Sequence, residues 1–137
     1  MTKIVMISGS RLIKDIGPGV ASLNRIMELK FSIILGDASG VDKLVQEYLR
    51  NSNYLNVQVY FALWSGNGKP RNVTGFQTVG VPGSYVDRDK AMCAVCDYGL
   101  ALWDGISRGT KDNIVACGAR TRHRTGNKTK IIRIGGS

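Results

Sequence analysis

The sequence predicts a three-layer α/β domain with a mostly parallel sheet of about five strands. Short apolar segments alternate along the chain with segments of helical periodicity, and most connections between them are short. The chain has 137 residues, close to the length of one typical domain. We therefore expect a single domain over residues 1–137, with helices covering the sheet.

The first half of the chain predicts three strands and two helices. Apolar runs that end at a glycine or a polar segment are typical of buried parallel strands, whereas apolar residues at i, i+3 and i+4 predict helices. The expected strands are Lys3–Ser8, Ser32–Leu35 and Asn56–Ala62, and the expected helices are Val20–Leu29 and Val41–Leu49.

The second half begins with a long irregular stretch. Residues Leu63–Ser84 contain five glycines and two prolines with little periodicity, which predicts a lid, a binding loop or an insertion. The elements expected after it are a helix over Val86–Cys96, a strand over Tyr98–Trp103, a helix over Gly109–Arg122 and a strand over Lys130–Ile134.

Composition indicates a globular protein of the cytoplasm. Hydrophobic residues make up 43% of the chain and charged residues 21%, and no apolar run approaches the ~20 residues that span a bilayer. The N-terminus lacks the long apolar core of a signal peptide, and three cysteines are a poor basis for a disulfide framework. We expect a soluble, reduced protein with no membrane partner.

The charge is strongly positive. The sequence carries 19 Lys and Arg against 10 Asp and Glu, a net charge of +9. From Arg108 onward eight basic residues stand against Asp112 alone, so 8 − 1 = +7 falls in this last part. Such a field favours anionic partners such as nucleotides or nucleic acid, although a solvated basic face would give the same composition.

Three loops follow predicted strands at the edge of the sheet where ligands of α/β domains bind. Ser8–Arg11 combines small residues with an arginine that suits phosphate. Gly36–Asp42 opens a helix with small residues, and Asp42 suits a ribose hydroxyl or the helix dipole. Trp103–Asp112 adds glycines, hydroxyls and two cations at another helix start. Together they predict a site for a phosphate-bearing ligand.

Two specific phosphate motifs and a metal site are excluded. The spacing in Gly36–Asp42 fits neither the dinucleotide G-x-G-x-x-G pattern nor a P-loop. Cys93 and Cys96 lie within a predicted helix without a second pair, so we interpret them as buried structural cysteines rather than as zinc ligands or a redox motif. We expect neither a metal nor a cofactor.

Aromatic and basic residues outside these loops have open interpretations. Trp64, Trp103 and Tyr85 suit stacking on a base, and Trp103 suits it best because it ends a predicted strand beside the third loop. Core packing is an equal alternative for Trp103 and is favoured for Trp64. His123 lies among arginines and receives no catalytic role. The cluster Arg120–Arg124 suits nucleic-acid backbone, a solvated helix end or a partner subunit.

The motifs together resemble the SLOG superfamily, which includes the Smf/DprA DNA-processing proteins and the LOG phosphoribohydrolases ("lysine decarboxylase-like" proteins). The matching segments are Gly9-Ser10-Arg11, Gly36-x-x-x-Gly40-Val41-Asp42, Tyr85 to Met92, and Asp97 to Thr110. They occur in the family's order and cover nearly the whole chain. The resemblance implies a Rossmann-like domain that binds a nucleotide, a nucleotide-derived ligand or a nucleic-acid phosphate.

The resemblance also implies residue roles. Arg88 stands where LOG enzymes carry an arginine, Gly109 and Thr110 match the family's Gly-Thr, and Asp112 falls at the position of the catalytic glutamate. The chain departs from the LOG pattern in having Trp103-Asp104-Gly105 for Pro-Gly-Gly and Asp112-Asn113 for Glu-Glu. Arg88 and Asp112 are thus the catalytic candidates if the protein is an enzyme.

The main expectation is binding of a nucleotide or nucleotide-derived ligand at the carboxyl edge of the sheet. Two alternatives stay open: cleavage of the N-glycosidic bond of nucleoside 5′-monophosphates, and binding of single-stranded nucleic acid. A homo-oligomer is expected from the LOG resemblance. The predicted ligand-binding residues are Gly9, Ser10, Arg11, Gly36, Ser39, Gly40, Asp42, Arg88, Trp103, Gly105, Ser107, Arg108, Gly109, Thr110 and Lys111.

Overall fold

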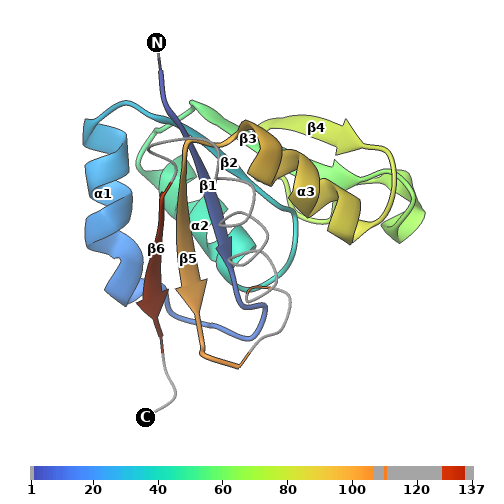
Figure 1. Ribbon diagram of the computed structural model, residues 1–137. Coiled ribbons are helices and arrows are strands. Elements are labelled where there is room, and N and C mark those ends of the chain that lie inside the picture. The colour runs from blue at the N-terminus through green and yellow to red at the C-terminus, as the bar shows by residue number, and fades with distance from the viewer. Residues whose placement is uncertain (1, 107–109, 111–127, 135–137) are drawn as a thin grey trace.

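A computed structural model describes residues 2–106, 110 and 128–134. Within these residues the chain forms one six-stranded sheet in the order β4-β3-β2-β1-β5-β6 (Figure 1). Every neighbouring pair of strands is parallel. The α/β prediction is confirmed, and the sheet has one strand more than expected.

The elements follow the expected order. The strands are β1 (Ile4–Gly9), β2 (Ser32–Leu35), β3 (Val57–Ala62), β4 (Gln77–Val81), β5 (Tyr98–Trp103) and β6 (Lys128–Arg133). The helices are α1 (Val20–Glu28), α2 (Val41–Asn51) and α3 (Tyr85–Val95), with two short 3₁₀ turns at Gly17–Gly19 and Gly66–Gly68. The predicted helix over residues 109–122 lies outside the described residues, except for Thr110.

Strand β4 corrects the prediction of a structureless segment over residues 63–84. It pairs in parallel with β3 at the edge of the sheet, with Gln77 opposite Gln58 and Val81 opposite Ala62. Its side chains are exposed or half-buried. An edge strand of this kind needs no continuous apolar run, so the sequence carries little signal for it.

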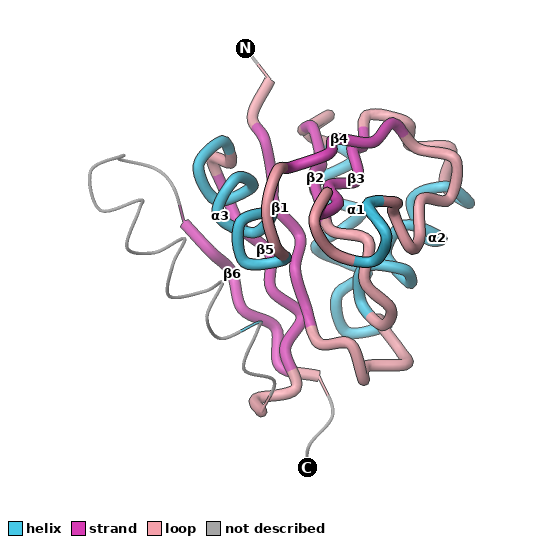
Figure 2. The backbone as a smooth tube through the Cα atoms, turned by 90° about the vertical axis from the view of Figure 1, so that its right-hand side faces the viewer, coloured by secondary structure: helices cyan, strands magenta, loops and turns pink. Residues whose placement is uncertain are grey.

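Helices pack on both faces of the sheet. Figure 2 shows α1 and α2 on one side of the strands and α3 on the other. Alternating strand residues serve the two faces: Ile7 and Leu35 pack with α1 and α2, whereas Met6 and Ile34 pack with Met92 and its neighbours on α3. This alternation follows from the period-two direction of side chains along a strand.

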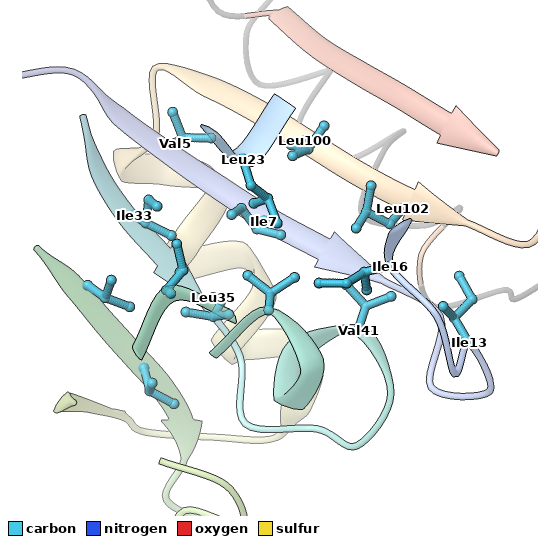
Figure 3. Packing of buried hydrophobic residues seen from close by; sticks show 14 of the residues in the cluster. Val5, Ile7, Ile13, Ile16, Leu23, Ile33, Leu35, Val41, Leu100 and Leu102 are labelled. Carbon is cyan, nitrogen blue, oxygen red and sulfur yellow. The ribbon is translucent and has the colours of Figure 1, made fainter. Parts of the chain in front are cut away.

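The larger core lies between the sheet and the first two helices. Five of its side chains are fully buried and come from five different elements (Figure 3): Ile7, Leu23, Leu35, Val41 and Leu102. Burial on this scale fixes α2 against β1 and β2, since each fully buried aliphatic side chain stabilises the fold by about 1.5–3 kcal/mol. The ends of these strands are thereby held beside the start of α2.

The strand order reverses between β1 and its two neighbours. The chain runs from β1 through β2 and β3 to β4 on one side, and β5 lies on the other side of β1. In open parallel sheets a ligand binds beyond the carboxyl ends of the strands at such a reversal. Within the described residues, no helix is both long and apolar enough to cross a membrane.

Candidate ligand-binding site

A pocket of about 580 Å³ opens at the carboxyl end of β1, where the strand order reverses. Its volume lies in the range of small-molecule sites. Residues from the β1 turn, the start of α2, the segment before β4, helix α3 and Thr110 meet in it. The lining residues are Ile7, Ser8, Gly9, Ser10, Arg11, Leu12, Gly36, Ala38, Asp42, Arg71, Tyr85, Arg88, Asp89, Met92 and Thr110.

Glycines allow these segments to approach one another. A Cβ on Gly9 would lie 2.5 Å from both the Leu102 carbonyl oxygen and a Val41 methyl group. Gly40 adopts a φ of 75°, and a Cβ there would lie 2.4 Å from the Arg11 carbonyl oxygen. Both positions therefore require glycine for steric reasons.

Ser10 joins three loops rather than facing outward. It is 1% exposed, and its carbonyl oxygen accepts a hydrogen bond from the Val41 backbone N–H at 3.2 Å. Its Oγ accepts one from the Asp104 backbone N–H at 3.2 Å, and its own N–H donates to the Leu102 carbonyl oxygen. The hydroxyl predicted to meet a ligand thus fixes the β1 turn to α2 and to the end of β5.

Asp37 is the centre of a buried ionic cluster that the sequence did not indicate. Its Oδ1 accepts hydrogen bonds from Arg88 Nη1 at 2.8 Å and from Arg71 Nη2 at 3.1 Å. Its Oδ2 accepts two more from Arg71, from the backbone N–H at 2.8 Å and from Nε at 3.3 Å. Burial acts to raise the pKa of Asp37, but the hydrogen bonds and charges of the arginines outweigh it and hold that pKa below 3.8.

Arg88 is also committed to partners inside the protein. It is 7% exposed, and its Nε and Nη2 donate to Asp89 Oδ1 at 3.0 and 2.9 Å, in addition to the bond to Asp37. Burial acts to lower the pKa of Arg88, but the carboxylates of Asp89, Asp42 and Asp37 raise it overall, so the guanidinium stays charged. A ligand would meet a guanidinium whose charge is already balanced.

Tyr85 connects the two arginines on the pocket wall. The guanidinium carbon of Arg71 lies 4.3 Å from the centre of the Tyr85 ring, and that of Arg88 lies 5.2 Å from it. Both distances are within the range of cation–π attraction. The ring predicted to stack on a base therefore lines the pocket while two guanidinium groups lie close to it.

Asp42 is the carboxyl group in this cluster that receives no guanidinium hydrogen bond. It is 6% exposed, and its Oδ2 accepts a bond from the Ala38 backbone N–H at 3.2 Å. Burial raises the pKa of Asp42 to about 7, although the charge of Arg88 and the Ala38 hydrogen bond act in the opposite direction. Gly36 allows Asp42 and Arg88 to lie close to its backbone, since a Cβ there would lie 2.7 Å from Asp42 Oδ2 and 2.9 Å from Arg88 Cζ.

Gln46 ties the segment before β4 to the same edge of the sheet. This fully buried side chain donates to the carbonyl oxygens of Gly36, at 3.1 Å, and Asn72, at 3.0 Å. Its Oε1 accepts a hydrogen bond from the Thr74 hydroxyl at 2.8 Å. Arg71 thus reaches the pocket from a segment anchored at several points, although this segment belongs to the stretch expected to be irregular.

The predicted ligand-binding residues divide into three groups. Those on the pocket wall are Gly9, Ser10, Arg11, Gly36, Asp42, Arg88 and Thr110. Those described but not on the wall are Ser39, Gly40, Trp103 and Gly105. Those outside the described residues are Ser107, Arg108, Gly109 and Lys111, together with Asp112, His123 and the cluster Arg120–Arg124.

Two further expectations are wrong. Trp64 does not fill the core, because 78% of it is exposed. Cys93 is disulfide-bonded, which differs from the expectation of a fully reduced protein. Cys93 and Cys96 are buried beside Met6 and Met92, in agreement with a structural role. In the described part of the chain no group of three or more His, Cys, Asp or Glu side chains is placed to hold a metal ion.

Asp37, Arg71 and Asp89 were missed by the sequence analysis. Asp37 lies inside the Gly36–Asp42 loop, but a carboxylate at that place has no local pattern that distinguishes it from a surface turn residue. Its partner Arg88 is 51 residues away, and Arg71 lies 34 residues away. The one available signal was the adjacency of Arg88 and Asp89 in a helix that faces the sheet.

Comparisons with known proteins found no related protein. No protein-family model matches the chain, and no curated protein matches it significantly. The SLOG resemblance remains a prediction from its motifs, and the function rests on the pocket itself.

Proposed function

We propose that the protein binds a nucleotide or a nucleotide-derived ligand in the pocket at the carboxyl end of β1. The observation that carries this proposal is the convergence of the turn after β1, with its exposed Arg11, and the Gly36–Asp42 loop on one cavity of about 580 Å³. The cavity lies at the reversal of strand order, the usual ligand position of open parallel sheets. The resemblance to the SLOG superfamily supports the same ligand class.

Arg11 is the cation best suited to hold the ligand's phosphate. It lines the pocket and is exposed to solvent, whereas Arg88 and Arg71 are paired with carboxylates. An exposed guanidinium suits this task because it can donate two hydrogen bonds at once to phosphate oxygens.

A thermal-shift screen at low salt tests the proposal. The panel holds AMP, GMP, ADP-ribose, NAD, cyclic dinucleotides and a short single-stranded DNA. A ligand at about 100 times its Kd stabilises the folded state by about 2.7 kcal/mol, which shifts the melting temperature by several degrees. We expect a shift with at least one small nucleotide. A shift with none of them would contradict the proposal, and a shift with DNA alone would favour the nucleic-acid alternative.

The Arg11→Ala variant makes the test specific to the pocket. Loss of a charge-assisted hydrogen bond to phosphate is expected to weaken binding about tenfold or more. Arg25→Ala is the matched control, because Arg25 is an exposed arginine on α1 paired with Glu28 and does not line this pocket. Equal affinity in both variants would remove Arg11 from the site. Analysis of the same samples for released base tests the phosphoribohydrolase alternative.

A further inference from the structure

The wall of the pocket formed by α2 and α3 carries more carboxylates than cations. Asp42, Asp89 and Arg88 lie on this wall. Arg71 also lines the pocket, and Asp37, which does not line it, pairs with both arginines, so that three acidic groups stand against two basic ones. The two guanidinium groups donate their hydrogen bonds to Asp37 and Asp89. Asp42 is therefore the carboxyl group in excess.

Asp42 has an unmet capacity to accept hydrogen bonds. One of its oxygens accepts from the Ala38 backbone N–H, and for the other the structure shows no hydrogen-bond donor among the described residues. Asp42 lines the cavity, and only 6% of the residue is exposed to solvent. A buried acceptor of this kind is stabilised when a ligand supplies the donor.

A phosphate group does not suit this wall. A dianion placed against Asp42 would be repelled by it, and by Asp89 behind the Arg88 pair. A hydroxyl group suits it, because an O–H donates to a carboxylate oxygen in a short, charge-assisted hydrogen bond. A ribose cis-diol offers two such hydroxyls side by side, which matches the two oxygens of one carboxylate.

We propose that Asp42 binds the ribose 2′,3′-diol of the ligand, so that the pocket selects ribonucleotides over 2′-deoxyribonucleotides. The sugar lies against Asp42 on the pocket wall, and the phosphate is held by the exposed side chain of Arg11. This inference rests on the proposed function and adds to it the class of sugar and the direction in which the ligand lies.

Arg88 and Gly36 act as positioning residues for this subsite. Arg88 neutralises Asp37 and Asp89 and lies next to Asp42, which keeps the wall from repelling a nucleotide altogether. The absence of a side chain at Gly36 allows Asp42 and Arg88 to lie together. Neither residue has to touch the sugar for the selection to operate.

Matched nucleotides test the inference on the unaltered protein. Affinities are measured by calorimetry for AMP, GMP, CMP and UMP, each beside its 2′-deoxy and arabinosyl counterparts, in which the 2′-hydroxyl is removed or inverted. Sites that hydrogen-bond a substrate hydroxyl discriminate strongly against an analogue without it. We expect both counterparts to bind about tenfold or more weakly than the ribonucleotide.

The Asp42→Asn variant assigns the selection to this side chain. The amide keeps the volume and one acceptor oxygen, so the ratio between ribonucleotide and deoxynucleotide is expected to fall severalfold while the nucleotides still bind. Glu47→Gln is the matched control, because Glu47 is an exposed acid further along α2, and it should leave the ratio unchanged.

The outcomes are separable. Equal binding of ribonucleotides and deoxynucleotides would overturn the inference and leave the proposed function standing. An unchanged ratio in a folded Asp42→Asn protein would also overturn it, by removing Asp42 as the group that reads the diol. Absence of binding by every nucleotide would contradict the proposed function itself. If Asp42→Asn does not fold, the arabinosyl and deoxy comparisons on the unaltered protein decide alone.

Discussion

The carboxyl group of Asp42 is buried in the first turn of α2, and its surroundings set its protonation. Its pKa is raised from 3.8 to about 7, mainly by burial. An acid whose pKa is raised on folding binds more protons in the folded state than in the unfolded state between these two values. The free energy of unfolding therefore falls as pH rises from about 4 to about 7, and the full loss is present above pH 7.

The Asp42→Asn substitution should remove this pH dependence. One pKa unit corresponds to about 1.4 kcal/mol, so the contribution of Asp42 is on the order of 4 kcal/mol between pH 4 and pH 8. We expect the variant to gain stability relative to the unaltered protein as pH rises over this range, as measured by urea unfolding without ligand. The pKa of Asp37 is lowered, so the titration of Asp37 changes stability only below about pH 4, outside this range. A stability difference that is the same at both ends of the range would contradict the burial of an unpaired Asp42.

The residues that line the pocket could be predicted only in part from the sequence. Gly9, Gly36 and Asp42 were found because they follow strands, and the topology of a parallel sheet brings strand ends together. The partners of Arg88 were not found, since an ion pair between residues 37 and 88 depends on tertiary packing. The sequence also predicted that Arg88 binds the ligand, whereas the structure pairs its guanidinium with the carboxylates of Asp37 and Asp89.

Among the elements, the segment between β3 and α3 contributes Arg71 to the site, and the sequence patterns did not predict this contribution. Residues 71–74 lie against the start of α2 through Asp37 and Gln46, and strand β4 follows at the edge of the sheet. Its glycines and prolines suggested a loop, and polar residues on an exposed edge strand gave no apolar run. The inner strands β1, β2 and β5 were predicted closely because burial on both faces requires continuous apolar sequence.

Gln46→Met tests how firmly this segment is tied to α2. Methionine has a similar volume but leaves the buried carbonyl oxygens of Gly36 and Asn72 without these donors, so we expect a loss of about 2–4 kcal/mol of unfolding free energy. Gln58→Met on the exposed side of β3 is the control and should change stability by less than about 0.5 kcal/mol. Equal effects of the two substitutions would mean that the Gln46 hydrogen bonds do not hold the segment.

For the whole molecule, charge and topology both indicate a ligand site at the carboxyl edge of the sheet. The chain carries a net charge of +9, whereas the pocket is lined by both the exposed Arg11 and the acidic residues Asp42 and Asp89. A uniformly basic surface would bind polyanions without selection, whereas a lining with both charges favours a ligand that has an anionic group and hydroxyl groups. Of the basic residues from Arg108 onward, Lys128, Lys130 and Arg133 belong to β6, and the others lie outside the described residues.

A titration of the ¹⁵N-labelled protein with AMP and GMP, followed by backbone amide NMR, tests the central claim most directly. The account predicts that the largest shift changes occur in residues 8–12, 36–42 and 85–89, the segments that meet in the pocket. It also predicts small changes along α1, which packs on the sheet away from these segments. Shift changes confined to other regions, or none with either nucleotide, would contradict the assignment of this pocket as a nucleotide site.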